Sequence, residues 1–221
     1  MNRVLLEVAV ETLSEAVAAA ESGADRLELC SRLDLGGLTP ALEHFHGIRA
    51  AVAIPIVVMI RARAGQFVYC DSEVTAMIEA IATFAPAQPD GFVFGALTSG
   101  ESIDRHACDK LVEACGSIPA IFHRAWDERR RSPEELDVLI DLGFRRLLTS
   151  GGESRAPDGA GAIREWVQRS AGRIEILPGA GITPMNVSEL IRSTGCTQVH
   201  GTFKNCVRAA RLALDHFAGA G

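Results

Sequence analysis

The stretch from His123 to Asp127 places three ionisable side chains directly after an apolar run. That run, Ile118–Phe122, is typical of a buried strand. Burying a charge is costly unless the charge is paired or used, and parallel α/β proteins bind ligands at the carboxyl ends of their strands. We therefore expect a functional site here, with His123 as a general acid/base or a metal ligand. Asp127 would orient His123 or pair with Arg124.

Polar side chains occupy similar positions along other apolar runs. Strand side chains alternate with a period of two, so Glu28 and Cys30 share one side of their strand, and Glu7 lies inside the first apolar run. We expect these residues to point into one interior, although an ion-paired interior that binds no ligand is the alternative. The predicted polar cluster consists of Glu7, Glu28, Arg61, His123 and His200. The predicted catalytic residues are His123, Glu28, Glu7 and Asp127.

Glycine-containing turns close the late apolar runs and suggest an anion site. Glycine exposes backbone N–H groups, and the start of a helix adds positive potential. The alternative is that glycine only permits tight turns. Arginine side chains would supply the opposing charge through two-pronged hydrogen bonds. The predicted ligand-binding residues are Arg61, Arg63, Arg124, Ser150, Gly151, Gly152, Gly179, Ala180, Gly181 and His200.

The elements that must position these residues alternate along the chain as strand and helix. Thr39 and Thr183 each precede a proline and are predicted helix N-caps, and Ser132 with Pro133 predicts another helix start. Strands are predicted at 4–10, 25–30, 55–61, 90–97, 118–123, 145–150, 173–177 and 197–200, each followed by a helical segment.

About eight strand–helix pairs are the number that a TIM (β/α)8 barrel needs. The 221 residues are therefore predicted to form one such domain, spanning 1–221. The strands are nearly continuous in valine, isoleucine and leucine, as expected for parallel strands covered by helices. A doubly wound open sheet is the alternative, and it is less favoured because no Gly-x-Gly-x-x-Gly turn follows the first strand.

Composition excludes several classes of partner. The formal net charge of −6 argues against a nucleic-acid partner. No run of about 18 apolar residues and no signal-peptide pattern is present, so we expect no membrane partner, a cytoplasmic location and reduced cysteines. None of the six cysteines forms a Cys-x-x-Cys pair. Cys108 and Cys115 lie seven residues apart in a helical segment and are expected in the core.

Several segments together resemble the CutC family of copper homeostasis proteins. The resemblance implies a cytosolic TIM barrel that forms homo-oligomers, is linked to copper tolerance and binds Cu(I) through cysteine. Cys30 is the cysteine in a family motif at a strand end, so the resemblance implies that it is a metal ligand. Cys70, Met59 and His123 are possible partners for it. The resembling segments are Leu5–Val8, Gly23–Cys30, Gly36–Pro40, Ile60–Tyr69, Phe122–Asp127, Leu148–Gly152, Gly179–Gly181 and Val199–His200.

The chain departs from the family pattern at several positions. In one loop Ala62 replaces a proline, Ala64 a glycine and Gln66 an acidic residue, and near the end of the chain Gly201–Phe203 replaces a stretch rich in serine and alanine. We expect the loop after the third strand to be reshaped. Two functions are carried forward, with a metal ion or a small molecule as the partner. One is a copper homeostasis protein that binds Cu(I), for which soft sulfur ligands are needed. The other is an enzyme that acts on a small anionic or phosphorylated molecule at the barrel mouth.

Overall fold

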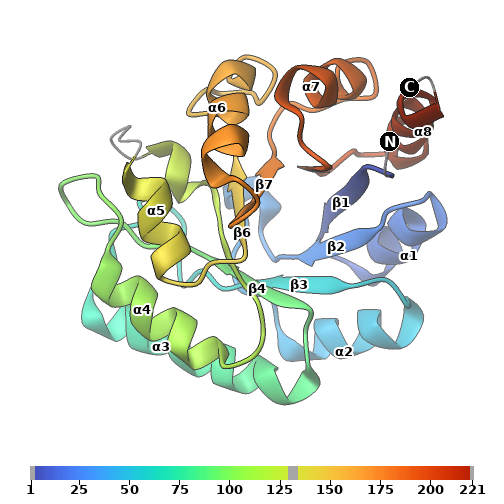
Figure 1. The fold of residues 1–221 in the computed structure, drawn as a ribbon. Coiled ribbons are helices and arrows are strands. Elements are labelled where there is room, and N and C mark those ends of the chain that lie inside the picture. The colour runs from blue at the N-terminus through green and yellow to red at the C-terminus, as the bar shows by residue number, and fades with distance from the viewer. Residues whose placement is uncertain (1–2, 129–133, 220–221) are drawn as a thin grey trace.

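The computed structural model describes residues 3–128 and 134–219, and Figure 1 shows a ring of strands surrounded by helices. All seven hydrogen-bonded strand pairs are parallel. The TIM-barrel prediction is confirmed. The strands are β1 (Leu5–Val10), β2 (Arg26–Leu29), β3 (Ile56–Met59), β4 (Gly91–Phe94), β5 (Ala120–Phe122), β6 (Arg146–Thr149), β7 (Glu175–Pro178) and β8 (Gln198–Gly201).

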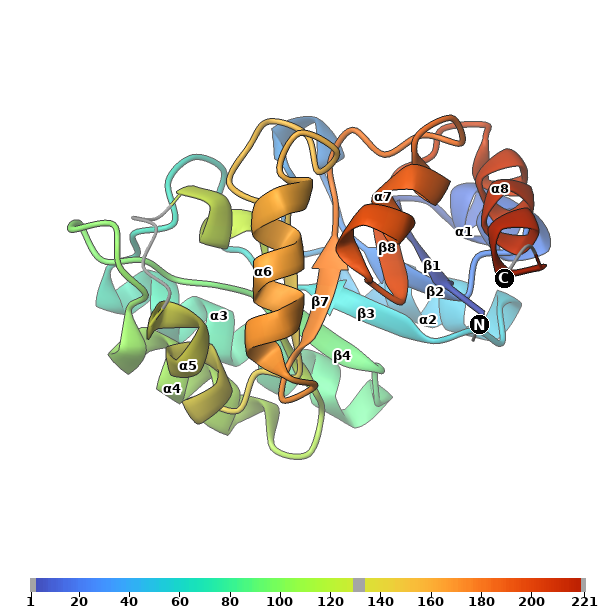
Figure 2. The ribbon, with the colours of Figure 1, turned by 45° about the horizontal axis from the view of Figure 1, so that its top comes forward.

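The helices form the outer layer around the strands (Figures 1 and 2). Short 3₁₀ helices at Leu33–Leu35 (η1), Ala85–Ala87 (η2) and Arg124–Glu128 (η3) interrupt the connecting loops. No helix in the described ranges is long and apolar enough to cross a membrane. The α-helices are α1 (Leu13–Glu21), α2 (Leu42–Ala51), α3 (Asp71–Phe84), α4 (Arg105–Cys115), α5 (Glu134–Asp141), α6 (Ala160–Ser170), α7 (Val187–Thr194) and α8 (Val207–Gly219).

The barrel has one seam that backbone hydrogen bonds do not close. The hydrogen-bonded order runs from β7 through β6 down to β1 and then to β8, and no ladder joins β7 to β8 in the described part of the chain. Side chains cross this seam instead. The Gln198 Nε2 of β8 donates to Oε2 of Glu175 of β7 at 3.3 Å across the seam. The Arg26 guanidinium of β2 donates to Gln198 Oε1 at 2.9 Å and holds that side chain from the barrel interior.

Two kinds of packing fill the space around the strands. The large apolar core lies between the sheet and the helices, and Cys108 and Cys115 of α4 belong to it, which confirms their predicted place. Burial raises the pKa of both thiols to about 12. Inside the barrel, an apolar cluster of five side chains occupies one part: Cys30, Val57, Met59, Val93 and Ile121.

Two predicted helix caps are wrong. The helix after Thr39 begins only at Leu42, with Ala41 as its N-cap. The Thr39 hydroxyl instead bonds the backbone N–H and carbonyl of Arg61, which ties the β2–α2 loop to the end of β3.

The second wrong cap is at the start of α7. Asn186, rather than Thr183, is the N-cap residue of this helix. Its side-chain Oδ1 accepts a hydrogen bond from the Thr183 N–H at 2.8 Å, so the threonine belongs to the preceding turn. The predicted helix start at Ser132 and Pro133 lies outside the described residues.

Close backbone packing holds the β6–α6 loop in place. A Cβ on Gly159 would lie 2.1 Å from the Ser150 carbonyl oxygen and 2.7 Å from the Gly151 Cα. Because backbone atoms cannot move aside as a flexible side chain can, only glycine fits at position 159. A Cβ on Gly161, two residues further on in α6, would meet nothing within 4 Å.

These two glycines make a matched pair of variants. We expect Gly159→Ala to destabilise the fold by about 2 kcal/mol or more, because the loop must shift away from the new methyl group. Gly161→Ala should stabilise it by a few tenths to about 1 kcal/mol through helix propensity. Urea unfolding measures both values. Equal effects of the two substitutions would contradict the packing described for Gly159.

Candidate functional site

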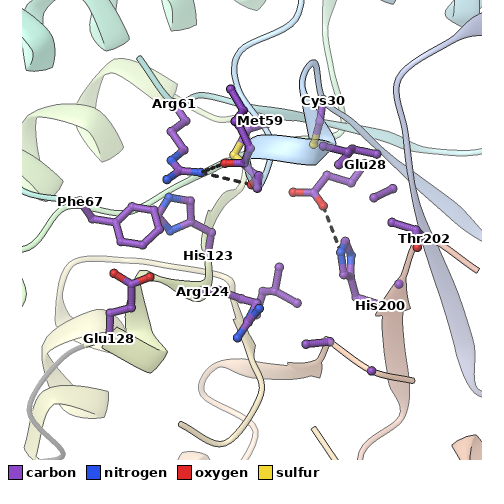
Figure 3. Close-up of a pocket in the computed structure, with 18 of the residues that line it drawn as sticks. Glu28, Cys30, Met59, Arg61, Phe67, His123, Arg124, Glu128, His200 and Thr202 are labelled. Atoms are coloured by element: carbon purple, nitrogen blue, oxygen red, sulfur yellow. Dashed lines mark hydrogen bonds and ion pairs between the residues drawn. The ribbon is translucent and has the colours of Figure 1, made fainter. Parts of the chain in front are cut away.

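A cavity of about 780 Å³ opens at the carboxyl ends of the strands. Figure 3 shows Arg61, Phe67 and His123 grouped on one side of it, and Glu28 and His200 on the other. The sequence-predicted residues that line the cavity are Glu28, Cys30, Arg61, His123, Arg124, Ala180, Gly181 and His200. Glu7 is buried and does not line the cavity, but it is hydrogen-bonded to His200, which does. The expected polar cluster is therefore assembled at the mouth, and the roles assigned to its members stay predictions.

His200 stands between two carboxylates from neighbouring strands. Its Nδ1 lies 2.8 Å from Glu7 Oε1, and its Nε2 lies 3.3 Å from Glu28 Oε2. Glu7 also accepts a short hydrogen bond from the Arg26 guanidinium. Burial opposes the charge on His200, but the two carboxylates outweigh it and raise its pKa. The two carboxylates therefore favour the protonated form of His200.

The pKa values of the two carboxylates in this cluster shift in opposite directions. Burial would raise the pKa of Glu7, but the charge of Arg26 and the hydrogen bond with His200 lower it well below its usual range. Burial raises the pKa of Glu28 to about 7. Glu28 has no arginine partner as close as Arg26 is to Glu7, so the raised pKa is not offset in the same way. Glu28 Oε1 is buried and has no hydrogen-bond partner. Glu28 is thus the member of the cluster that remains available to a ligand.

Glu7, Glu28 and His200 offer ligand atoms within 4.8 Å of one another, close enough to surround a metal ion. In the structure the imidazole lies between the carboxylates, and Arg26 already neutralises Glu7. A cation would have to displace these contacts. The donor set is oxygen and imidazole nitrogen, which suits zinc or manganese better than Cu(I).

His123 accepts a hydrogen bond at one ring nitrogen, and its other ring nitrogen has no partner. Its Nδ1 accepts a hydrogen bond from the Ala125 N–H at 3.3 Å, so the proton resides on Nε2. That Nε2 is buried and has no hydrogen-bond partner. The ring packs against Phe67 with 4.6 Å between centroids. Burial, together with the positive charges of Arg61 and Arg124, lowers the pKa of His123 to about 3.

Arg61 organises the rim of the mouth. One terminal nitrogen donates to the carbonyl oxygens of Leu35, Gly36 and Gly37, and the other donates to the Gly65 carbonyl at 2.7 Å. The guanidinium stacks over Phe67 at 4.5 Å from the ring centroid. Its Nε has no hydrogen-bond partner, and no carboxylate of residues 3–128 or 134–219 pairs with Arg61.

The structure does not place Arg63 with Arg61. Arg63 pairs with Glu73 at the start of α3, donates to the Val68 carbonyl and stacks on Tyr69. It does not line the mouth cavity. The expectation that it faces the late loops is therefore corrected. The physical reason is that Arg63 lies in an irregular loop beyond the end of β3, where strand alternation no longer applies, and Glu73 in the first turn of α3 offers it a carboxylate.

Asp127 occupies the glycine-containing turn after β6. Its carboxylate accepts hydrogen bonds from the Thr149 hydroxyl at 2.6 Å, from the Ser150 N–H at 2.9 Å and from the Gly152 N–H at 3.0 Å. Arg124 pairs with the same carboxylate at 3.0 Å. The Gly151 N–H donates to Thr149 Oγ1. The donors predicted to hold an anion are already used within the protein, so anion binding there stays a prediction that requires Asp127 to leave.

The β7–α7 turn contributes less than expected to an anion site. The Gly179 N–H donates to the Thr149 carbonyl at 2.9 Å, and the Ala180 carbonyl accepts from Ala156. Gly181 packs against Arg155, because a Cβ there would lie 2.8 Å from the Arg155 side chain. Ala180 and Gly181 line the cavity wall.

Cys30 and Met59 bring two sulfur side chains to the cavity wall. The Cys30 Sγ and Met59 Cε lie 3.2 and 3.5 Å from the place that a Cβ on Gly37 would take. Burial, followed by the charges of Glu28 and Glu7, raises the pKa of the Cys30 thiol well above its usual range. The thiol is therefore protonated in the structure.

Sequence reasoning missed the residues that support the cluster from below. Arg26 holds Glu7, and Gln198 and Glu175 connect it to the seam. Arg146 pairs with Glu175 at 2.9 Å. A signal was present, because Arg26 precedes Glu28 by two residues and Gln198 precedes His200 by two, so each pair shares a strand side.

Replacing Asp127 tests the turn after β6. The two carboxylate oxygens of Asp127 accept hydrogen bonds from four donors. In Asp127→Asn one of these oxygens becomes an amide N–H₂ group, which faces donors and cannot accept from them. We expect a loss of about 2–3 kcal/mol in the free energy of unfolding. Asp141→Asn, at the exposed end of α5, is the control and should change it by less than about 0.5 kcal/mol. Similar values for both variants would remove the supporting role of Asp127.

The low pKa of His123 makes a signed prediction about stability. The unfolded chain takes up the His123 proton near its ordinary pKa of 6.5, whereas the folded protein takes it up only near 3. Folding stability is then lost as the pH falls below about 6.5, by up to about 1.4 kcal/mol per pH unit. We expect the natural protein to lose about 2–3 kcal/mol relative to His123→Phe between pH 6.5 and 4.5. A pH-independent difference between their unfolding free energies would show that His123 titrates normally.

Comparisons with known proteins agree with this architecture. A solved CutC protein from Streptococcus agalactiae superposes with a TM-score of 0.85 at 33% identity, covering 90% of this chain and 98% of that one. Thiamine phosphate pyrophosphorylase from Pyrococcus furiosus, at 13% identity and a TM-score of 0.65 over 98% of each chain, shares the fold alone.

Sequence relatives give the same result. The human copper homeostasis protein cutC homolog is 41% identical over 199 residues, which is 90% of this chain and 73% of that protein. The homolog of the same name from Caenorhabditis elegans is 41% identical over 202 residues, 91% of this chain and 81% of that protein. The model of the CutC family matches residues 4–205. The chain therefore belongs to the CutC family.

Proposed function

We propose that this protein serves copper homeostasis and binds Cu(I) at the barrel mouth through Cys30 and Met59. The names of the human and Caenorhabditis elegans relatives support the role in copper homeostasis. The observation that carries the binding proposal is that a thiol and a thioether line one cavity and pack around Gly37. Cu(I) is selected by such soft sulfur ligands.

Binding of Cu(I) at this site must be accompanied by loss of a proton from Cys30. A thiol ligates a metal as the thiolate, so Cu(I) would displace the proton of Cys30, and the nearby ion would lower the pKa that burial raises. His123, whose imidazole is neutral, lines the same cavity and offers a nitrogen if the ring turns. A cytoplasmic location and a homo-oligomeric state are part of this proposal and stay predictions.

Anaerobic titration with Cu(I) against a chromogenic chelator tests the proposal. We expect Cys30→Ser to weaken Cu(I) binding at least about ten-fold, because a hydroxyl is a hard ligand. Met59→Leu, which keeps the volume of the side chain, should weaken it by a smaller factor. Cys70→Ser is the matched control: Cys70, a partner considered for Cys30 from the sequence, does not line the cavity and is an exposed N-cap residue of α3, where serine caps equally well. Unchanged affinity of Cys30→Ser would overturn Cu(I) binding at the mouth.

One observation favours a second function, the binding of a small anionic molecule in the same cavity. Arg61 is 5% exposed, and its charge has no carboxylate partner within the two described ranges. A buried charge is costly without a counter-ion. An anionic ligand at the mouth would supply one, and the enzyme predicted as the alternative from the sequence would use such a ligand as its substrate.

A further inference from the structure

We propose that the mouth cavity binds a small carboxylic acid that also carries a hydroxyl or amino group. The carboxylate would accept hydrogen bonds from Arg61 and His123, and the second group would donate to Glu28. This inference rests on the second proposed function and names its ligand class.

The first step is the pair of unsatisfied donors. Arg61 Nε and His123 Nε2 are buried and have no hydrogen-bond partner. Both side chains pack on the same ring: the Arg61 guanidinium lies 4.5 Å and the His123 ring 4.6 Å from the centroid of Phe67. Leaving such donors unpaired costs free energy that a bound acceptor would recover. The two N–H donors, together with the positive charge of the Arg61 guanidinium, are complementary to a carboxylate.

The second step is the unsatisfied acceptor on the other side of the cavity. Glu28 is 2% exposed, and its Oε1 has no hydrogen-bond partner, whereas its Oε2 faces His200 at 3.3 Å. Figure 3 shows the Glu28 carboxylate pointing into the space that Arg61 and His123 also border. A ligand that fills this space must therefore bring a donor to Glu28 as well as an acceptor to the opposite wall.

The third step is the state of the late loops, which argues against a phosphate group as the anion. The N–H groups of Ser150 and Gly152 donate to Asp127, and that of Gly151 donates to Thr149. The backbone cradle that late loops of such barrels offer to phosphate is therefore filled by a carboxylate of the chain itself. Among the described residues that line the cavity, the buried donors without a hydrogen-bond partner come from the side chains of Arg61 and His123, which suits a smaller planar anion.

The charges around the cavity agree with this ligand. Arg124 is paired with Asp127, and His200 with Glu7, so these pairs add little net charge. Glu128 also lines the cavity but is exposed, where solvent screens it. The wall of apolar side chains, including Met59 and Leu148, would contact the carbon skeleton. The volume of about 780 Å³ accepts molecules larger than a single anion.

A matched panel of three-carbon probes tests the proposal on copper-free protein. We expect lactate and alanine to bind at least about ten-fold more tightly than propionate, which lacks the donor, and than 1,2-propanediol, which lacks the charge. Binding would be followed by NMR titration and by the rise in melting temperature. Inorganic phosphate is included as an anion of another geometry.

Each result of the panel has one meaning. Propionate binding as tightly as lactate would overturn the role of Glu28 but leave the anionic function standing. Phosphate binding most tightly would likewise replace the ligand class and keep that function. Diol binding equal to lactate, or no binding by any probe at tens of millimolar, would overturn both.

Two variants locate the site. His123→Phe removes the unpaired donor but keeps the packing on Phe67, so the variant should fold, melt within a few degrees of the natural protein and bind lactate at least about ten-fold more weakly. Arg61→Met should abolish binding, and it also removes the rim contacts. The controls are His106→Phe and Arg164→Met on exposed positions of α4 and α6, which should bind as the natural protein does. Unaltered lactate binding by a folded His123→Phe variant would overturn the proposed site.

Discussion

The buried ionic cluster at β8 is the interaction on which the mouth of this barrel depends. Backbone hydrogen bonds do not join β7 to β8, so the last strand is held through β1 and through side chains. His200 joins β8 to Glu7 of β1 and to Glu28 of β2, and Arg26 extends the contacts to Gln198. Removing one charge from such a buried set leaves its partners uncompensated, which costs more than the pair contributes. The cluster therefore sets the position of Glu28 as well as the closure of the barrel.

A second carboxylate, Asp127, performs a comparable task for the loops. It collects the hydroxyl and N–H groups of the β6–α6 turn and pairs with Arg124 from its own 3₁₀ helix. The turn is in contact with Gly159 at the start of α6, where no side chain fits. The Asp127 carboxylate thus occupies the place in this loop that a bound phosphate would take. The unpaired groups of the mouth lie instead on the wall around Phe67 and, across the cavity, on Glu28.

The division between satisfied and unsatisfied groups is the most informative property of the site. Glu7, Arg26 and Asp127 have their hydrogen bonds filled by the protein and are best understood as supports. Glu28, Arg61 and His123 each keep one buried polar atom without a partner, and all three line the same cavity. The sulfur atoms of Cys30 and Met59 share that cavity. A metal ion and a small acid would therefore compete for, or share, one space.

The sequence by itself determined the fold and the end of the barrel that carries the site. Period-two alternation placed Glu28 with Cys30 on the interior, and the apolar run before His123 placed that residue at a strand end, because both follow from local backbone geometry. Only the tertiary structure decided which charged groups are paired. Arg61 and Arg63 are two residues apart, yet one enters the cavity and the other turns to Glu73 on the outer side. Likewise, the β6–α6 turn is filled by Asp127 from the preceding loop, 23 residues from Ser150. Such pairings depend on distances between segments far apart in the chain, and a pattern of residue types along one segment does not contain those distances.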